Sequence, residues 1–314
     1  MHRAAGLAAL ALPPIAAPAG AATPAQTLHL LVPYPAGGAV DYLARLLAEP
    51  LRAQLQRPVV VENVAGAAGA IGLQKLLEGP ADGHAIAIGT DSDLILAPLV
   101  NPDIRYSSAD FSFLGTVNVA PMVLVAGPRT GTQPLAALLG PRAEPLAFAN
   151  YGMGSNAHLL ALKLAQRARI EALHVPYRGI APLLQDLLSG QVDVAFLPLG
   201  GSLPDMLAAG KLRCVGVAAA QRHPLLAGVP TFDEAGYGPF VHLSWGGVLM
   251  PRGAPTAVVA ELHRGVQRAI EDPHLRAQLA ATGGTASAPM SLAQADRFVQ
   301  AELARYRLLQ GSGR

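Results

Sequence analysis

The chain has 314 residues, of which 51% are hydrophobic and 14% charged, and its formal net charge at pH 7 is +2. A nearly neutral protein lacks the dense positive charge that draws proteins to nucleic acids or anionic membranes, so we expect no nucleic-acid partner. The single cysteine, Cys214, excludes an intramolecular disulfide and a cysteine-based metal cluster. Because it stands in an apolar run, we expect a buried thiol rather than a nucleophile.

The first 25 residues have the layout of a secretory signal peptide. Arg3 precedes a run of alanine and leucine, and small residues follow around Ala19 to Ala25. We therefore expect residues 1–25 to direct export and the mature protein to be periplasmic. A misplaced start codon or an alanine-rich tail is the alternative. Further along, no stretch reaches the roughly 18 uninterrupted apolar residues of a membrane span, which predicts a soluble protein.

Strand-like and helix-like segments alternate in two series. In each, a short apolar run is followed by a segment with a 3.6-residue hydrophobic period, which predicts βα units and largely parallel sheets. The first series has predicted strands at 27–35, 58–64 and 84–90 and predicted helices at 41–55, 71–77 and 91–99. The second has predicted strands at 145–152, 171–178, 192–198 and 212–220 and predicted helices at 156–167, 180–189 and 202–209.

The helix predicted at 41–55 has two distinct faces. Five leucines between positions 43 and 55 share one face, and charged residues share the other. Asp41 is a candidate N-cap, because its carboxylate could accept an N–H group of the first turn. Pro50 lacks an N–H group and predicts a kink or an early end of the helix.

Two extended segments, at 111–128 and 242–251, flank the second series. Their positions predict that the chain crosses twice between two lobes. A single continuous doubly wound sheet is the alternative. Trp245, the only tryptophan, stands at the second crossing, so we expect its fluorescence to report closing of the lobes. Helices are predicted after that crossing at 255–271, 273–282 and 291–309, and the lobes are predicted to comprise residues 26–122 with 246–314, and residues 123–245.

Gly37 and Gly38 stand in a turn between a predicted strand and a predicted helix. Glycine permits positive φ angles and lets a ligand approach the backbone, and the N–H groups at a helix start favour an anion. The pair is therefore a candidate site for a carboxylate, and a purely structural turn is the alternative.

A second turn of the same form spans residues 150–156. It contains Gly154, Ser155 and Asn156, and His158 lies one turn into the predicted helix, where it contacts a ligand or supports local structure. Two such turns, one in each lobe, could face each other across a cleft. Ser155 does not fit the G-x-S-x-G pattern of a hydrolase nucleophile, because Gly154 directly precedes it.

Other motifs for cofactors are not found in the sequence. Gly66, Gly69 and Gly72 are spaced G-x-x-G-x-x-G rather than G-x-G-x-x-G, and no phosphate-binding G-x-x-x-x-G-K-[ST] occurs. The nine histidines show no metal-binding spacing. We therefore predict no cofactor, no metal and no enzymatic activity.

Four segments together resemble a known family. They read LVPYPAGGAVDYLARLLAEPL, VVVENVAGAAGAIGLQKL, YGMGSNAHL and VPYRGIAPLLQDLLSGQVDVAF. In this order they are similar to the TctC/Bug family, the extracytoplasmic solute receptors of tripartite tricarboxylate transporters. The resemblance implies an α/β fold of the periplasmic binding protein type II kind, with two lobes, a ligand cleft and two hinge crossovers.

The resemblance also implies a function. A receptor of this family captures a small organic carboxylate for the membrane permease subunits of its transporter, and we expect a monomer. A ligand-sensing protein that signals to a sensor kinase is one alternative, and a serine hydrolase using Ser155 is another. The implied carboxylate-binding residues are Tyr34, Ala36, Gly37, Gly38, Asp41, Gly154, Ser155, Asn156 and His158, with wall residues Thr90, Asp91, Arg178 and Gly179.

Two departures from the family pattern bear on the ligand. Val40 stands where the family often has threonine or serine, which removes a hydroxyl group. The segment 62–69 reads ENVAGAAG, whereas ENRPGAGG is usual in the family. The apolar Val40 at the mouth of the site suits a less charged acid, and the sequence does not identify which one.

Overall fold

The computed structural model describes residues 26–311 of the chain. The predicted signal peptide, residues 1–25, lies outside the described residues. Within them, no helix combines the length and the apolar character that crossing a membrane requires.

The first lobe is built around three parallel strands in the order β2-β1-β3, and the second around parallel strands in the order β7-β5-β6. The βα units predicted from the sequence are present in both. The first group comprises β1 (Leu28–Val32), α1 (Ala39–Leu55), β2 (Val59–Asn63), α2 (Ala70–Glu78), β3 (Ala85–Thr90) and α3 (Ala97–Val100). The second comprises α4 (Leu135–Leu138), β5 (Leu146–Asn150), α5 (Asn156–Ala168), β6 (Ala172–Pro176), α6 (Ile180–Leu188), β7 (Val194–Pro198), α7 (Leu203–Ala208) and β8 (Arg213–Ala218).

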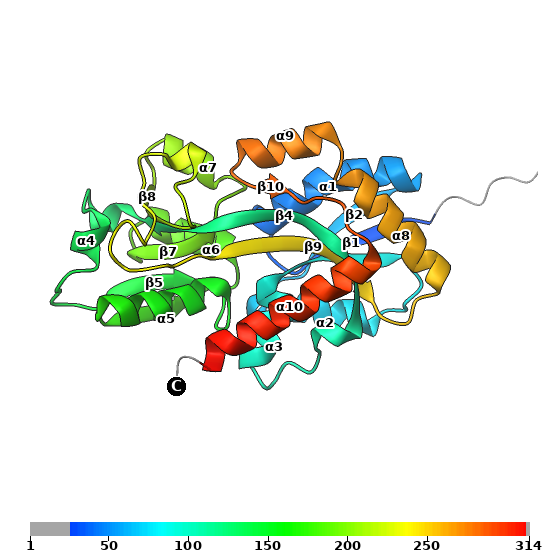
Figure 1. Ribbon diagram of the computed structural model, residues 1–314, viewed down its shortest axis with the longest axis horizontal. Helices are drawn as coiled ribbons and strands as arrows, with labels where there is room; N and C mark the ends of the chain where they lie inside the picture. The colour runs from blue at the N-terminus through cyan, green and yellow to red at the C-terminus, as the bar shows by residue number, and fades with distance from the viewer. Residues whose placement is uncertain (1–25, 312–314) are drawn as a thin grey trace, which may run out of the picture.

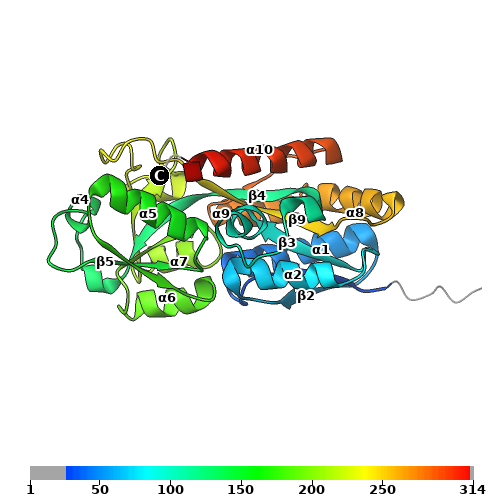
Figure 2. The same cartoon turned by 90° about the horizontal axis from the view of Figure 1, so that it is seen from below.

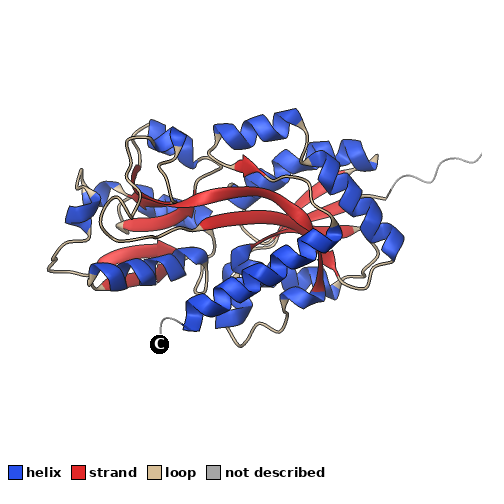
Figure 3. Ribbon diagram, in the orientation of Figure 1, coloured by secondary structure: helices blue, strands red, loops and turns tan. Residues whose placement is uncertain are grey.

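Two long antiparallel strands, β4 (Phe111–Ala126) and β9 (Leu243–Pro251), run side by side between these groups (Figures 1 and 3). The β4 strand pairs with β9 as far as Pro121, and from Met122 onward it pairs with β7 and β8 of the second group. The prediction of largely parallel strands therefore holds within each lobe. The strands form one continuous hydrogen-bonded path, but β9 and β4, which join the two groups, are antiparallel to their neighbours, so the path is not a doubly wound parallel sheet.

The C-terminal helices pack on the first lobe. Helix α8 lies against α1, and α10 lies along β4. Figure 2 shows α10 on the opposite side of the crossing strands from α2 and α6. These elements are α8 (Thr256–Ala269), α9 (Pro273–Ala281), β10 (Thr285–Ala286) and α10 (Leu292–Gly311).

The structure of helix α1 differs from the sequence prediction in two places. Its N-cap is Gly38, not Asp41, which lies inside the first turn. The helix also does not end at Pro50 but continues to Leu55. Proline in a helix costs about 3 kcal/mol, but Leu47 and Leu51 on the same helix are fully buried, and burying one such side chain contributes a comparable free energy.

The surroundings of the single cysteine, Cys214, and of the single tryptophan, Trp245, indicate that both side chains serve the packing of the fold. Burial raises the pKa of Cys214 to about 12, which agrees with an unreactive thiol. The Trp245 ring packs edge-on against Phe113 and Phe298, and its Nε1 donates a hydrogen bond to Glu302 Oε2 over 2.8 Å. These partners belong to β4 and α10, so we expect Trp245 fluorescence to respond to the packing of α10, and its response to closing of the lobes stays a prediction.

Candidate ligand-binding site between the lobes

A narrow cavity of 30 Å³ lies where the two lobes meet. Its wall combines the start of α1, the end of β3, the start of β9 and three segments of the second lobe. The lining residues are Tyr34, Pro35, Gly38, Ala39, Val40, Thr90, Ser92 and Ser244 from the first side and Tyr151, Ile180 and Pro198 from the second. Both lobes therefore contribute to one enclosed space.

The turn that leads into α1 is fixed by the carboxylate of Asp41. Its Oδ2 accepts hydrogen bonds from the Gly37 N–H at 2.9 Å and from Arg45 Nε at 3.0 Å, and its Oδ1 accepts one from Asn63 Nδ2 at 3.0 Å. Gly37 has φ +85°, a conformation that favours glycine. Burial alone would raise the pKa of Asp41, but these hydrogen bonds outweigh it and hold the pKa below its usual value.

Asp41 therefore fixes the turn and does not itself line the cavity. It accepts the N–H of Gly37, so that amide is not available to an anion. The N–H groups in the first turn of α1 have no partner within the helix, and the residues Ala39 and Val40 of that turn line the cavity. The start of α1 is thus held against the cavity with its partial positive charge.

A buried chain of hydroxyl and carboxyl groups supports the wall beside this turn. Thr90 Oγ1 donates to Asp93 Oδ2 over 2.8 Å, the Thr90 N–H donates to Asp93 Oδ1 over 2.8 Å, and the Tyr34 hydroxyl donates to the Ala68 carbonyl over 3.2 Å. Burial raises the pKa of Asp93 to about 7, although the hydrogen bonds from Thr90 and Tyr34 oppose the shift. These contacts hold Thr90 and Tyr34 in place.

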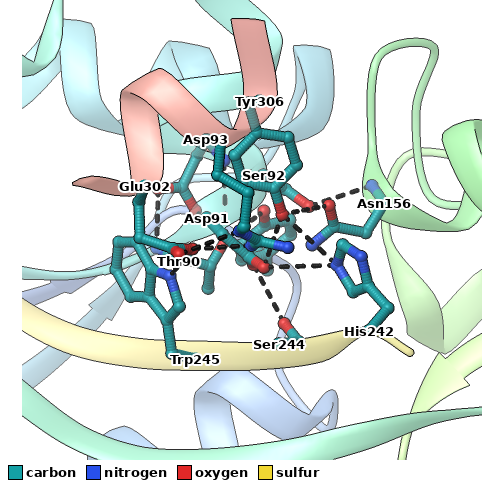
Figure 4. A network of polar contacts seen from close by, with 12 residues as sticks. Thr90, Asp91, Ser92, Asp93, Asn156, His242, Ser244, Trp245, Glu302 and Tyr306 are labelled. Atoms are coloured by element: carbon teal, nitrogen blue, oxygen red, sulfur yellow. Dashed lines mark hydrogen bonds and ion pairs between the residues drawn. The ribbon is translucent and has the colours of Figure 1, made fainter. Parts of the chain in front are cut away.

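Behind the wall, Tyr306 of α10 reaches into a second buried network (Figure 4). Its hydroxyl lies 2.8 Å from Asp91 Oδ2, 2.9 Å from Asn156 Oδ1 and 3.3 Å from His242 Nε2. Asp91 follows β3, Asn156 begins α5 in the second lobe, and His242 directly precedes β9. The network therefore joins the C-terminal helix to both lobes and to a crossing strand.

Two cavity residues connect the wall to this network. Ser244 Oγ donates to Asp91 Oδ1 over 3.0 Å, and Ser92 Oγ accepts the N–H of Asn156 over 3.1 Å. Asp91 and Asn156 are themselves fully buried and do not line the cavity. The sequence analysis assigned both to the ligand site, and the structure places them behind the residues that line the cavity.

The glycine, serine and histidine of the second turn lie outside the cavity, although Tyr151 of the same turn lines it. Ser155 is fully buried and caps α5, because its Oγ accepts the N–H of His158. Gly154 donates its N–H to His158 Nδ1 over 3.3 Å, and both residues line a separate groove of 290 Å³ that also includes Val100. Burial, and then the neighbouring His174, lower the pKa of His158. The structure thus does not bring Gly154, Ser155 or His158 to the shared cavity.

The remaining predicted residues divide between the cavity and its surroundings. Ala36 and Arg178 are exposed and do not line the cavity. Gly179 is buried where the lobes touch, and a Cβ atom there would lie 2.3 Å from Pro35 Cδ. Of the predicted set, the structure brings Tyr34, Gly38 and Thr90 to the cavity wall.

Eight of the eleven wall residues lie outside the predicted set. Three of them, Pro35, Ala39 and Val40, lie within three positions of Gly38, and the other five are distant from it in the chain. Ser92, Tyr151 and Pro198 lie at or just beyond strand ends, Ile180 begins α6, and Ser244 lies near the start of β9. Their proximity to strand and helix ends is the one sequence signal that they share. Apolar residues there are equally typical of a core, so residue type alone does not reveal them.

Two α/β lobes joined by crossing strands, with a cavity between them, define the architecture of the type II periplasmic binding proteins. The model of the tripartite tricarboxylate transporter family receptor (TctC) matches residues 43–312. The chain belongs to this family of solute receptors.

Individual relatives agree with this assignment. The chain is 34% identical over 279 residues to the protein BugT of Bordetella pertussis, which covers 86% of this chain and 85% of BugT. Its fold is similar to that of MatC from Rhodopseudomonas palustris with bound malate, with a TM-score of 0.85 and 28% identity over 91% of this chain and 99% of MatC. It is also similar to Rpa4515 of R. palustris with adipate, with a TM-score of 0.83 and 31% identity over 90% of this chain and 95% of that protein.

The Asp41 contacts predict a pH-dependent contribution to stability. A carboxyl group whose pKa is lowered on folding stabilises the protein above its ordinary pKa of 3.8, and the contribution is lost as the pH falls through the folded value. We expect Asp41→Asn to lower the free energy of unfolding at pH 7 by about 2 kcal/mol, with the difference from wild type shrinking below pH 4. Urea unfolding at several pH values measures this. The exposed Asp103→Asn is the control, and a difference that is constant with pH would contradict the prediction.

The Tyr306 network predicts a second effect on stability. Removing the hydroxyl in Tyr306→Phe leaves Asp91 and Asn156 without their shared partner, so we expect a loss of about 1–3 kcal/mol in the free energy of unfolding. The matched control is Tyr42→Phe, because the Tyr42 hydroxyl makes only a 3.5 Å contact with Gln278. Equal melting temperatures for the two variants would show that the network does not stabilise the fold.

Proposed function

We propose that this protein is a periplasmic receptor that binds a small organic carboxylate in the cavity between its lobes. The observation that carries the proposal is that the start of α1 lines a cavity to which both lobes contribute. The N–H groups at a helix start suit a carboxylate.

The relatives support the same class of ligand. MatC is described with bound malate and Rpa4515 with adipate, and both ligands are organic acids. Both proteins share the fold of this chain over more than nine tenths of their length. We carry over the class of ligand from them and not its identity.

Ligand entry requires the lobes to part. A cavity of 30 Å³ has room for about two water molecules, which is less than an organic acid requires. The strands β4 and β9 are the hinge, because they alone among the described strands extend from one lobe's sheet toward the other. We propose lobe boundaries that follow from this hinge, with residues 26–122 and 246–314 in one lobe and 123–245 in the other.

The cellular role follows the family. The receptor reaches the periplasm through a signal peptide in residues 1–25, acts as a monomer and delivers its acid to the membrane permease subunits of a tripartite transporter. Signalling to a sensor kinase uses the same fold and the same cavity, and the genes next to this one distinguish the two roles.

A hydrolase that uses Ser155 has less support. The hydroxyl oxygen of Ser155 accepts the N–H of His158, its side chain is fully buried, and the His158 ring accepts the N–H of Gly154. Among residues 26–311, no hydrogen bond joins a histidine ring to the Ser155 hydroxyl, whereas a serine nucleophile needs such a base. A binding protein without catalytic turnover is the function that we propose.

The receptor function predicts stabilisation by an acid. A ligand at a hundredfold excess over its dissociation constant raises the free energy of unfolding by about 2.7 kcal/mol. We expect at least one acid from a panel of mono-, di- and tricarboxylates, amino acids and aromatic acids to raise the melting temperature at millimolar concentration. The protein is refolded beforehand to remove any acid bound during expression. If no acid in the panel shifts the melting temperature, the carboxylate assignment is wrong.

The position of the cavity predicts the effect of Gly38→Val. A Cβ atom at Gly38 would lie 3.6 Å from Pro35 O and 3.9 Å from Ile180 Cβ, which are ordinary contacts, so the variant folds with its side chain in the cavity. We expect at least a tenfold weaker affinity for the stabilising acid in calorimetry. Gly228→Val, at an exposed glycine with no atom within 4 Å of its Cβ position, is the control. Wild-type affinity in Gly38→Val would place the ligand elsewhere.

A further inference from the structure

Asp93 is a carboxyl group directly behind the cavity wall. It is fully buried, and Thr90 binds both of its oxygens. The Thr90 N–H donates to Oδ1 and the Thr90 hydroxyl donates to Oδ2, each over 2.8 Å. Because Thr90 also lines the cavity, a single hydroxyl group separates the Asp93 carboxyl from the proposed place of the acid.

Among residues 26–311, no basic side chain forms an ion pair with Asp93. Its neighbour Asp91, by contrast, has His242 Nε2 at 3.5 Å. The titratable groups that face Asp93 from the surrounding elements are acidic or phenolic, namely Asp91, Tyr34, Tyr106 and Tyr151. Burial in these surroundings raises the pKa of Asp93 to about 7, although the hydrogen bonds from Thr90 oppose the shift.

The cavity wall does not supply a positive side chain either. No lysine, arginine or histidine of the described residues lines it. An acid bound there as an anion places a second negative charge near Asp93 in a region shielded from water, and two like charges in such a region favour protonation of one of them. Asp91 does not take this proton, because Ser244 and Tyr306 donate hydrogen bonds to it.

Protonation of Asp93 also changes what Thr90 can offer. While Asp93 is ionised, it accepts the Thr90 hydroxyl proton, so that Thr90 presents only lone pairs to an acid. A protonated Asp93 donates from Oδ2 to Thr90 Oγ1 instead, and the hydroxyl proton of Thr90 is then free to bind a carboxylate. One proton thus removes a repelling charge and adds a donor to the wall.

We propose that the protein binds its acid together with one proton, and that Asp93 takes up this proton when the acid enters the cavity. This inference rests on the proposed function, because it concerns the same cavity and the same acid. Asp93 is then a positioning residue, which acts on the acid through Thr90. Because the pKa of Asp93 is already about 7, the affinity is highest below this pH and falls as the pH rises through it.

The pH dependence of acid binding tests the inference. The probes are acetate, succinate, citrate, glutamate and benzoate, and calorimetry on the full, refolded chain follows the one that raises the melting temperature most. We expect its affinity to fall about tenfold between about pH 6 and pH 8, and buffers of different ionisation enthalpy to reveal an uptake of roughly 0.5–1 proton per acid at pH 8. An affinity that does not change over this range, without proton uptake, would overturn the inference.

The variant Asp93→Asn imitates the protonated carboxyl group, because its amide can donate to Thr90 Oγ1 while its carbonyl accepts the Thr90 N–H. We expect it to bind the same acid equally well at both pH values, and about tenfold more tightly than wild type at the higher one. Any titration of the acid itself is common to both proteins and cancels in the comparison. Asp103→Asn, at an exposed carboxylate, is the control.

The same variant separates Asp93 from His242 behind the wall. Protonation of His242 would also favour an anion at low pH, but it would persist in Asp93→Asn. A wild-type pH dependence in Asp93→Asn would therefore assign the proton to another group and contradict the inference.

The outcomes separate this inference from the function on which it rests. If an acid binds with an affinity independent of pH, the receptor function stands and Asp93 does not take up a proton. If no acid binds to the folded wild-type protein, both fail. Melting temperatures without ligand show whether Asp93→Asn is folded, and the wild-type measurement can overturn the inference even if it is not.

Discussion

The carboxylate of Asp41 fixes the turn on which the cavity depends. It accepts three hydrogen bonds, from Gly37, Arg45 and Asn63, and Arg45 compensates its charge. Because this carboxylate binds the backbone just before α1, the first turn of the helix is held against the second lobe. A helix start in a fixed position provides an anion site without any cationic side chain, which explains how a neutral wall can hold an acid.

The contact between the lobes has two different sides. Around the cavity the backbones approach closely at glycines, as at Gly179 beside Pro35 and at Gly152, where a Cβ atom would lie 2.8 Å from Ala68 Cβ. Behind the cavity, Tyr306 joins Asp91 to Asn156 through one buried hydroxyl group. The close backbone contacts on one side and the polar network on the other hold the two lobes in one closed conformation. The wall residues Ser92 and Ser244 are hydrogen-bonded to that network.

Most of the fold could be predicted from the sequence, because hydrophobic period and strand-to-helix alternation are local signals. The crossing strands were also predictable, since long extended segments flank the second series. The leucine pattern predicted the helix through residue 55, but the rule for proline suggested an early end at Pro50 that does not occur, because leucines buried against other elements compensate for it.

The site was predictable only in part. The turns at Gly38 and at Gly154 read alike in sequence, yet Gly154 packs against Val100 and only Gly38 lines the cavity. Behind the wall, Asp91 and Asn156 both contact the hydroxyl group of Tyr306. Tyr306 lies 215 positions after Asp91 and 150 positions after Asn156. Such distant pairings have no local signature. Ile180 begins an amphipathic helix, so its sequence context predicts a core residue. Only the packing of the two lobes shows that it lines the cavity.

The central claim is that the lobes close around an organic acid held at the start of α1. A distance measured between spin labels on the two lobes tests it most directly, with labels at the exposed Gln54 and Gln166 after Cys214→Ser removes the native thiol. In refolded, acid-free protein the account predicts a broad distribution that includes long distances. A saturating acid that raises the melting temperature should narrow it to a single short distance. An identical distribution with and without that acid would contradict the claim.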